Sequence, residues 1–175
     1  LSPDVPVIAD NIRPQAIAGV IGSNDSSVNK GSKSIIIESA FFDQNLIRKA
    51  SKKYRLQTES SYRFERGVDP LFVQEGIDFA TQLIIDICGG EVSEVIIVGK
   101  EPNVEKEICL RPDRVDSLIG IKIPKEEQES ILKALGFGVS KKNTSLIIKV
   151  PSWRPDVSGE ADLIEEIAVS YTHLT

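Results

Sequence analysis

Four carboxylates near the end of the sequence are the residues best suited to hold a metal ion. Asp162, Glu165 and Glu166 share one face of a predicted helix, because residues three and four apart are neighbours on a helix, and Asp156 comes just before it. No Lys or Arg lies between residues 159 and 171 to offset their repulsion. Carboxylate oxygens are the ligands that magnesium prefers. The residues alone leave open a magnesium site and a solvated acidic helix face.

A second group of charged residues lies in the stretch TESSYRFERGVDP, residues 58–70. Glu59 precedes Arg63 by four residues, which is the favourable order for an ion pair on a helix. We expect Arg63 and Arg66 to pair with nearby acids, including Asp69, as a structural latch. Catalysis is the weaker interpretation, since no nucleophile or base accompanies the arginines.

A basic run, RKASKKYR, carries Arg48, Lys49, Lys52 and Lys53. These residues predict either the solvated face of an amphipathic helix or a contact with RNA phosphates, and the sequence favours the solvated face. Ala18, Gly19 and Glu38 have a simple structural interpretation as well. Small residues allow backbones to approach closely in a sheet, and an acid can stand at its rim.

Composition and charge exclude several classes of protein. The chain has 175 residues and a formal net charge of −5, whereas a free-standing nucleic-acid binder usually carries a basic surplus. No apolar run approaches the length of a membrane span. We expect Cys88 and Cys109 to be buried thiols in a reducing cytoplasm, and His173 to be a tail residue rather than a ligand. With no Met and a start at Leu1, the chain is expected to be a fragment.

The helices and strands expected from the sequence indicate an α+β chain in two parts. The first is a truncated mixed β-sheet with helices over residues 1–103, and the second is a small winged-helix-like α/β domain over residues 104–175. In the first part, SIIIESAFF and EVSEVIIVGK predict strands, Asp43 caps a helix over residues 44–54 with Leu46 inward, and Asp69 and Pro70 begin a long amphipathic helix. In the second part, we expect a strand, two helices, a hairpin at residues 143–144 and a final helix.

At SSYRFERGVDP the chain resembles the β subunit of bacterial phenylalanyl-tRNA synthetase. IAGVIG and IIIESAFFD resemble the second half of the editing domain of that subunit. RPDRVDSLIG, ILKALGF and VPSWRPDVSGEADLIEEIA resemble the small domain that follows it. The resemblance departs from the family at Gly22-Ser23, where the family has two glycines, and in the final VSYTHLT, to which we assign no function.

The resemblance implies roles for the candidate residues. Ala18 and Gly19 would form the wall of an editing pocket, and Glu38 would recognise the hydroxyl of a mischarged tyrosine. Asp156, Asp162, Glu165 and Glu166 would bind magnesium at the contact with the catalytic α subunit.

The resemblance also implies partners. The parent enzyme would be a cytoplasmic assembly of two α and two β subunits that attaches phenylalanine to its tRNA with ATP, with no membrane or DNA partner. The fragment alone is expected to be inactive. An alternative function is a winged-helix-like nucleic-acid-binding module, which the acidic residues Glu126, Glu127 and Glu129 on its second helix disfavour.

Overall fold

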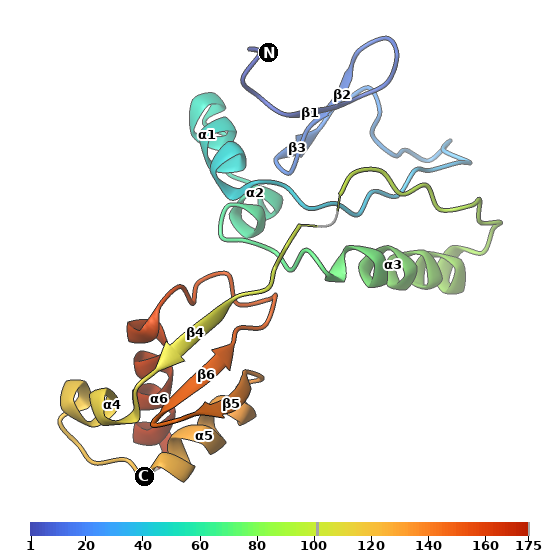
Figure 1. Ribbon diagram of the computed structural model, residues 1–175. Coiled ribbons are helices and arrows are strands. Elements are labelled where there is room, and N and C mark those ends of the chain that lie inside the picture. Colours follow the sequence, from blue (N-terminus) through green and yellow to red (C-terminus); the bar gives the residue numbers. More distant parts are fainter. Residues whose placement is uncertain (101, 175) are drawn as a thin grey trace. The chain divides into compact units, whose positions relative to one another are not determined.

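The chain folds as two compact units, Leu1–Glu101 and Pro102–Thr175 (Figure 1). The computed structural model describes residues 1–100 and 102–174, except for the side chains of residues 173 and 174. Each unit combines helices with a three-stranded antiparallel sheet, so the predicted α+β class is confirmed. Among the described helices, none combines the length and the apolar character needed to cross a membrane.

The first unit has a small sheet packed against a helix. Strands β1 (Val7–Ala9), β2 (Pro14–Ile17) and β3 (Ile21–Gly22) pair in the order β1-β2-β3. Helix α1 (Gln44–Tyr54) begins at Asp43, whose carboxylate accepts hydrogen bonds from two backbone amides in the first turn, as predicted. The side chains that share this core are Val5, Val20, Ile47 and Ala50.

One residue of α1 was wrongly predicted to face inward. Leu46 is 43% exposed, whereas Ile47 is completely buried. Consecutive helix positions are about 100° apart, so they cannot both face a core this small. The core of the first unit therefore accepts Ile47 and Ala50 and leaves Leu46 in solvent.

Helix α2 (Glu59–Phe64) begins at Thr58 with a capping box. The Thr58 hydroxyl accepts from the amide of Ser61, and the Ser61 hydroxyl accepts from the amide of Thr58. After α2 the chain turns at Gly67, whose φ of 98° favours glycine.

Helix α3 (Phe72–Cys88) is the predicted long amphipathic helix, and it ends at Gly89. Its predicted start is wrong by two residues. The Asp69 carboxylate accepts from the amide of Leu71 at 3.0 Å, which closes a local turn, and Leu71 precedes the helix without a capping side chain. Asp69 therefore stabilises the turn before the helix and is not its N-cap.

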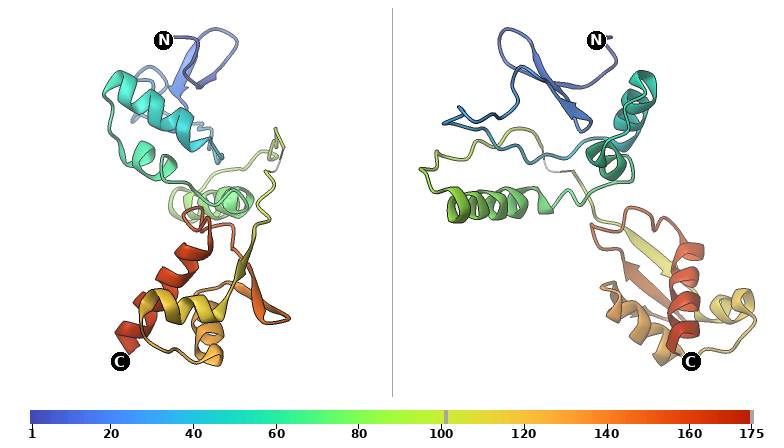
Figure 2. Two further views of the ribbon diagram at one scale, coloured as in Figure 1. Left: turned by 60° about the vertical axis from the view of Figure 1, so that its left-hand side comes forward. Right: turned by 180° about the vertical axis from the view of Figure 1, so that it is seen from behind.

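Two predicted strands of the first unit do not form. Residues 34–42 and 91–98 have no assigned strand, and both run as extended chain beside α3 (Figures 1 and 2). Their β-branched composition favours strands, but a strand also needs a neighbouring backbone with which to hydrogen-bond. No described strand pairs with either segment, and their apolar side chains, such as Ile36 and Val98, are almost fully exposed.

The second unit places helices against an antiparallel sheet with strand order β4-β6-β5. In the right-hand view of Figure 2, α6 lies along one face of this sheet, and it also contacts α4 and α5. Its elements, in chain order, are β4 (Glu107–Leu110), α4 (Pro112–Ile119), α5 (Lys125–Ala134), β5 (Gly138–Lys142), β6 (Ser145–Lys149) and α6 (Glu160–Leu174).

The predicted hairpin is present, and Asn143 takes the left-handed conformation at its turn with φ of 56°. The core of this unit is larger than that of the first. Its fully buried aliphatic side chains are Leu110, Val115, Leu132, Ile148, Leu163 and Ile167.

Both cysteines are exposed, so the expectation of buried thiols is wrong. In β4, successive side chains alternate between the two faces, and Ile108 and Leu110 take the buried positions. Cys109 therefore points to solvent. Cys88 is the last residue of α3, where none of the helix residues is buried.

Candidate functional site

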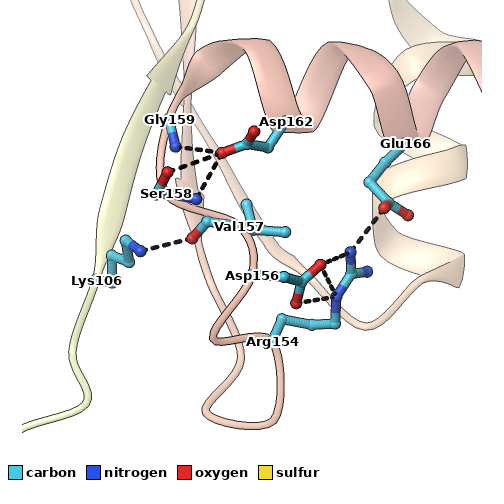
Figure 3. Close-up of polar contacts among 8 residues, drawn as sticks. All are labelled: Lys106, Arg154, Asp156, Val157, Ser158, Gly159, Asp162 and Glu166. Carbon is cyan, nitrogen blue, oxygen red and sulfur yellow. Dashed lines mark hydrogen bonds and ion pairs between the residues drawn. The ribbon is translucent and has the colours of Figure 1, made fainter. Parts of the chain in front are cut away.

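Asp162 lies in the first turn of α6 and binds the backbone at the start of its own helix (Figure 3). One carboxylate oxygen accepts from the amides of Ser158 and Gly159, at 2.7 and 2.8 Å, and from the Ser158 hydroxyl at 3.1 Å. The Ser158 and Gly159 amides, followed by the Ser158 hydroxyl, hold the pKa of Asp162 below its usual value. Asp162 therefore stabilises the beginning of α6 as an ionised carboxylate.

Arg154 connects two of the other candidate acids (Figure 3). Its Nη2 lies 2.7 Å from an oxygen of Asp156 and 2.6 Å from an oxygen of Glu166, and its Nε donates to Asp156 at 2.9 Å. The carboxylate of Asp156, and then that of Glu166, raises the pKa of Arg154. In return, the Arg154 guanidinium lowers the pKa of Asp156. The arginine thus supplies a countercharge from a position before the helix.

The four acids are not gathered around one point. Asp162 accepts hydrogen bonds from backbone amides, Asp156 and Glu166 pair with Arg154, and Glu165 is exposed. Within residues 1–100 and 102–174, no group of three or more His, Cys, Asp and Glu side chains is placed to hold a metal ion. This arrangement does not fit the expected magnesium site, which remains a prediction. The side chain of His173 lies outside the described ones.

In the first unit, Ala18 and Gly19 lie in the turn between β2 and β3. Ala18 is buried, and Gly19 has a φ of 65°. A Cβ added at Gly19 would lie 2.8 Å from Cδ1 of Ile47 and 3.0 Å from Cδ2 of Phe42. Both the conformation and the close packing therefore require glycine at this position.

Two hydroxyls of the α2 region hold the same turn. Thr58 donates to the carbonyl of Val20 at 2.7 Å, and Ser60 donates to the carbonyl of Gly19 at 3.0 Å. These bonds join segments about forty positions apart, so periodicity could not reveal them. The stretch that contains the two arginines thus also anchors the turn at Gly19.

Glu38 lies in the extended segment 34–42, which packs on Gly19 through Phe42. Its side chain is exposed, and partial desolvation still raises its pKa. Glu38 therefore shares a segment with a residue that contacts the turn.

The arginines of the predicted latch make local, exposed interactions. Arg63 pairs with Glu59 at 3.2 Å, and Arg66 pairs with Glu65 at 2.8 Å. Arg66 also lies over the ring of Tyr62, 3.6 Å from its centroid. Surface ion pairs of this kind contribute roughly 0–1 kcal/mol each, so the latch role remains a prediction.

The basic run forms the exposed face of α1, and part of it is already engaged. Lys53 pairs with Asp4 at 2.7 Å, and Arg48 donates to the carbonyl of Glu65 at 3.0 Å. Lys49 and Lys52 are exposed. This geometry agrees with a solvated helix face and leaves a contact with RNA untested.

Comparison with known proteins identifies the class of both units. A family model of the B3/4 domain matches residues 1–89, and one of the tRNA synthetase B5 domain matches residues 108–172. The chain therefore belongs to the B3/4 domain family, and its second unit carries a B5 domain.

Over nearly its whole length, the chain is similar to β subunits of phenylalanine–tRNA ligases. It is 44% identical over 167 residues to that of Coxiella burnetii, covering 94% of this chain and 21% of that protein. It is 42% identical over 166 residues to that of Ruegeria pomeroyi, covering 95% and 20%. The chain thus spans about a fifth of the length of these relatives.

A crystal structure of an N-terminal fragment of the phenylalanyl-tRNA synthetase β subunit from Pyrococcus horikoshii covers 39% of this chain and 20% of that one. Its sequence identity is 22% and its TM-score is 0.37. A likeness this distant does not bear on the fold.

Proposed function

We propose that this chain is the part of a phenylalanine–tRNA ligase β subunit that supports editing of mischarged tyrosyl-tRNA and assembly with the catalytic α subunit. The observation that carries the proposal is the continuous similarity to β subunits, at 42–44% identity over 94–95% of this chain. A B3/4 domain followed by a B5 domain, in one chain, supports the same assignment.

In this proposal, the turn at Ala18 and Gly19 forms one wall of the editing pocket. The turn is held by the hydroxyls of Thr58 and Ser60, so its backbone is rigid. A rigid wall suits selection by shape, because displacement by a substrate would break hydrogen bonds already made.

Glu38 supplies the chemical selectivity in the proposed pocket. A carboxylate can accept a hydrogen bond from the hydroxyl of tyrosine, and phenylalanine offers no such donor. A site built to pair with a hydroxyl rejects an analogue that lacks it, because the polar group of the site is left unpaired. The proposed role of Glu38 is therefore to bind the incorrect amino acid and not the correct one.

The test uses a complete ligase that contains this sequence in its β subunit. We expect Glu38→Ala to slow the hydrolysis of tyrosyl-tRNA while leaving the attachment of phenylalanine unchanged. Glu91→Ala, which removes an exposed acid from the same unit, is the matched control and should hydrolyse tyrosyl-tRNA at the wild-type rate. Equal hydrolysis by the Glu38→Ala variant and the control would refute the role of Glu38.

Partners and cofactors follow from the same proposal. The parent enzyme would contain two α and two β subunits, act in the cytoplasm on the phenylalanine tRNA, and use ATP and magnesium for aminoacylation by the α subunit. Lys49 and Lys52, on the exposed face of α1, are the residues most available for tRNA phosphates. The chain by itself is proposed to be inactive in both reactions.

A further inference from the structure

The arginine between two candidate metal ligands has the geometry of a built-in countercharge. The guanidinium of Arg154 contacts Asp156 through two nitrogens and contacts Glu166 through Nη2 at 2.6 Å (Figure 3). Bonds between an ionised donor and an ionised acceptor are stronger than neutral hydrogen bonds, and the fork of an arginine adds geometric specificity. A divalent cation at the same two carboxylates would have to occupy the volume that the guanidinium fills.

Burial distinguishes the Arg154–Glu166 pair from a loose surface pair, whereas the side chain of Asp156 is 60% exposed. The side chain of Arg154 is 20% exposed and that of Glu166 is 28% exposed, so solvent screens their interaction only in part. The guanidinium also lies 5.5 Å from the centroid of the Phe137 ring, and Phe137 belongs to the core of the unit. Arg154 is therefore held by an apolar neighbour as well as by charge.

The remaining acids do not offer a second route to a metal site. The Asp162 oxygen that faces the chain already accepts three hydrogen bonds at the start of α6. Displacing these donors would leave the amides of Ser158 and Gly159, just before α6, without this partner. Glu165 is exposed and by itself supplies only one carboxylate.

We propose that Arg154 closes this acidic cluster to divalent cations, so that the guanidinium and a metal ion are mutually exclusive at Asp156 and Glu166. In this chain the single positive charge of Arg154 offsets part of the negative charge of Asp156 and Glu166. The proposal stands independently of the editing role, because it concerns only contacts within the second unit, and it leaves the proposed contact with the α subunit without a shared magnesium ion at Asp156 and Glu166.

The test measures Mn²⁺ binding to the whole chain by the loss of the free-ion signal in electron paramagnetic resonance, with Mn²⁺ as the probe for magnesium. We expect the wild type to show no site at this cluster tighter than about 1 mM, the weak end of carboxylate sites. Arg154→Gln should bind Mn²⁺ at least about tenfold more tightly than wild type, because two facing carboxylates lose their countercharge. Adding Glu166→Gln to that variant should abolish the gain.

Arg63→Gln is the matched control, since it removes an arginine from an exposed ion pair in the first unit and changes the net charge equally. It should bind Mn²⁺ as the wild type does. Arg154→Lys is the second variant, for the case in which Arg154→Gln does not fold. One ammonium cannot hold both carboxylates as the guanidinium fork does, so Arg154→Lys should also bind Mn²⁺ more tightly than wild type.

Three results would overturn the proposal. A wild-type chain with a tight Mn²⁺ site that Glu166→Gln removes would show that the cluster is open. Folded Arg154→Gln and Arg154→Lys variants that bind no more Mn²⁺ than wild type would show that the arginine excludes nothing. If Arg63→Gln increases the affinity for Mn²⁺ as much as Arg154→Gln does, the increase is an effect of net charge.

Discussion

Replacing Gly19 by alanine tests whether the turn at the proposed pocket wall is as constrained as its geometry indicates. The residue has a φ of 65°, and a left-handed conformation costs a non-glycine residue roughly 1–2 kcal/mol. The added Cβ would lie 2.8 Å from Cδ1 of Ile47, which is completely buried, and such overpacking costs roughly 1–3 kcal/mol. Loss of chain entropy in the unfolded state offsets about 0.4–1 kcal/mol of this.

The expected net loss for Gly19→Ala is therefore roughly 1–4 kcal/mol in the free energy of unfolding of the first unit, a large share of the roughly 5–15 kcal/mol of a typical domain. Gly22→Ala is the matched control. It lies in β3 with no atom within 4 Å of an added Cβ and has no positive φ. We expect the control to be neutral or slightly stabilising.

The assay follows each unit separately during urea unfolding. Hydrogen exchange of α1 reports on the first unit, because Ile47 is the side chain that the new methyl group would strike. Fluorescence of Trp153, the single tryptophan, reports on the second unit and should be unchanged. If the amides of α1 are equally protected from hydrogen exchange in the Gly19→Ala and Gly22→Ala variants, the steric reasoning for the wall is refuted.

Two further predictions concern the helix starts. Thr58→Ala should destabilise the first unit by about 1 kcal/mol or more, because it removes the cap of α2 and the bond to the Val20 carbonyl; Thr58→Ser, which keeps both bonds, should recover most of the loss in the same exchange assay. For Asp162, whose pKa is lowered in the folded chain, the stabilisation is complete above the unfolded pKa near 4 and is lost as the pH falls through the folded pKa. Asp162→Asn should therefore flatten the fall in the urea midpoint below pH 5 relative to wild type, whereas Glu165→Gln should not; identical pH profiles for Asp162→Asn and wild type would contradict the capping role.

The helices could be predicted well because their signals are local. Asp43 and Gly89 mark the ends of α1 and α3, and the apolar spacing within each helix is regular. Local signals could not show that residues 34–42 and 91–98 do not form strands. Their composition is that of strands, but pairing depends on a distant backbone that composition does not specify.

The sequence located the acids on the final helix but did not reveal their partners. The sequence places Asp162 and Glu166 on one helix, and the structure agrees. The countercharge comes from Arg154, which lies before the helix and reaches it only through the bend of the chain. Likewise, the bonds from Thr58 and Ser60 to the turn at Gly19 depend on the tertiary fold.

The most direct test of the account is whether this chain binds a separately produced α subunit of phenylalanine–tRNA ligase. The full-length β subunit with the same sequence is the positive control, and each protein is passed alone over the affinity matrix to exclude non-specific retention. Because the assembly role is assigned to the second unit of this chain, the chain should elute together with the α subunit in a defined ratio. If the full-length β subunit captures the α subunit and this chain does not, the proposed assembly role is wrong.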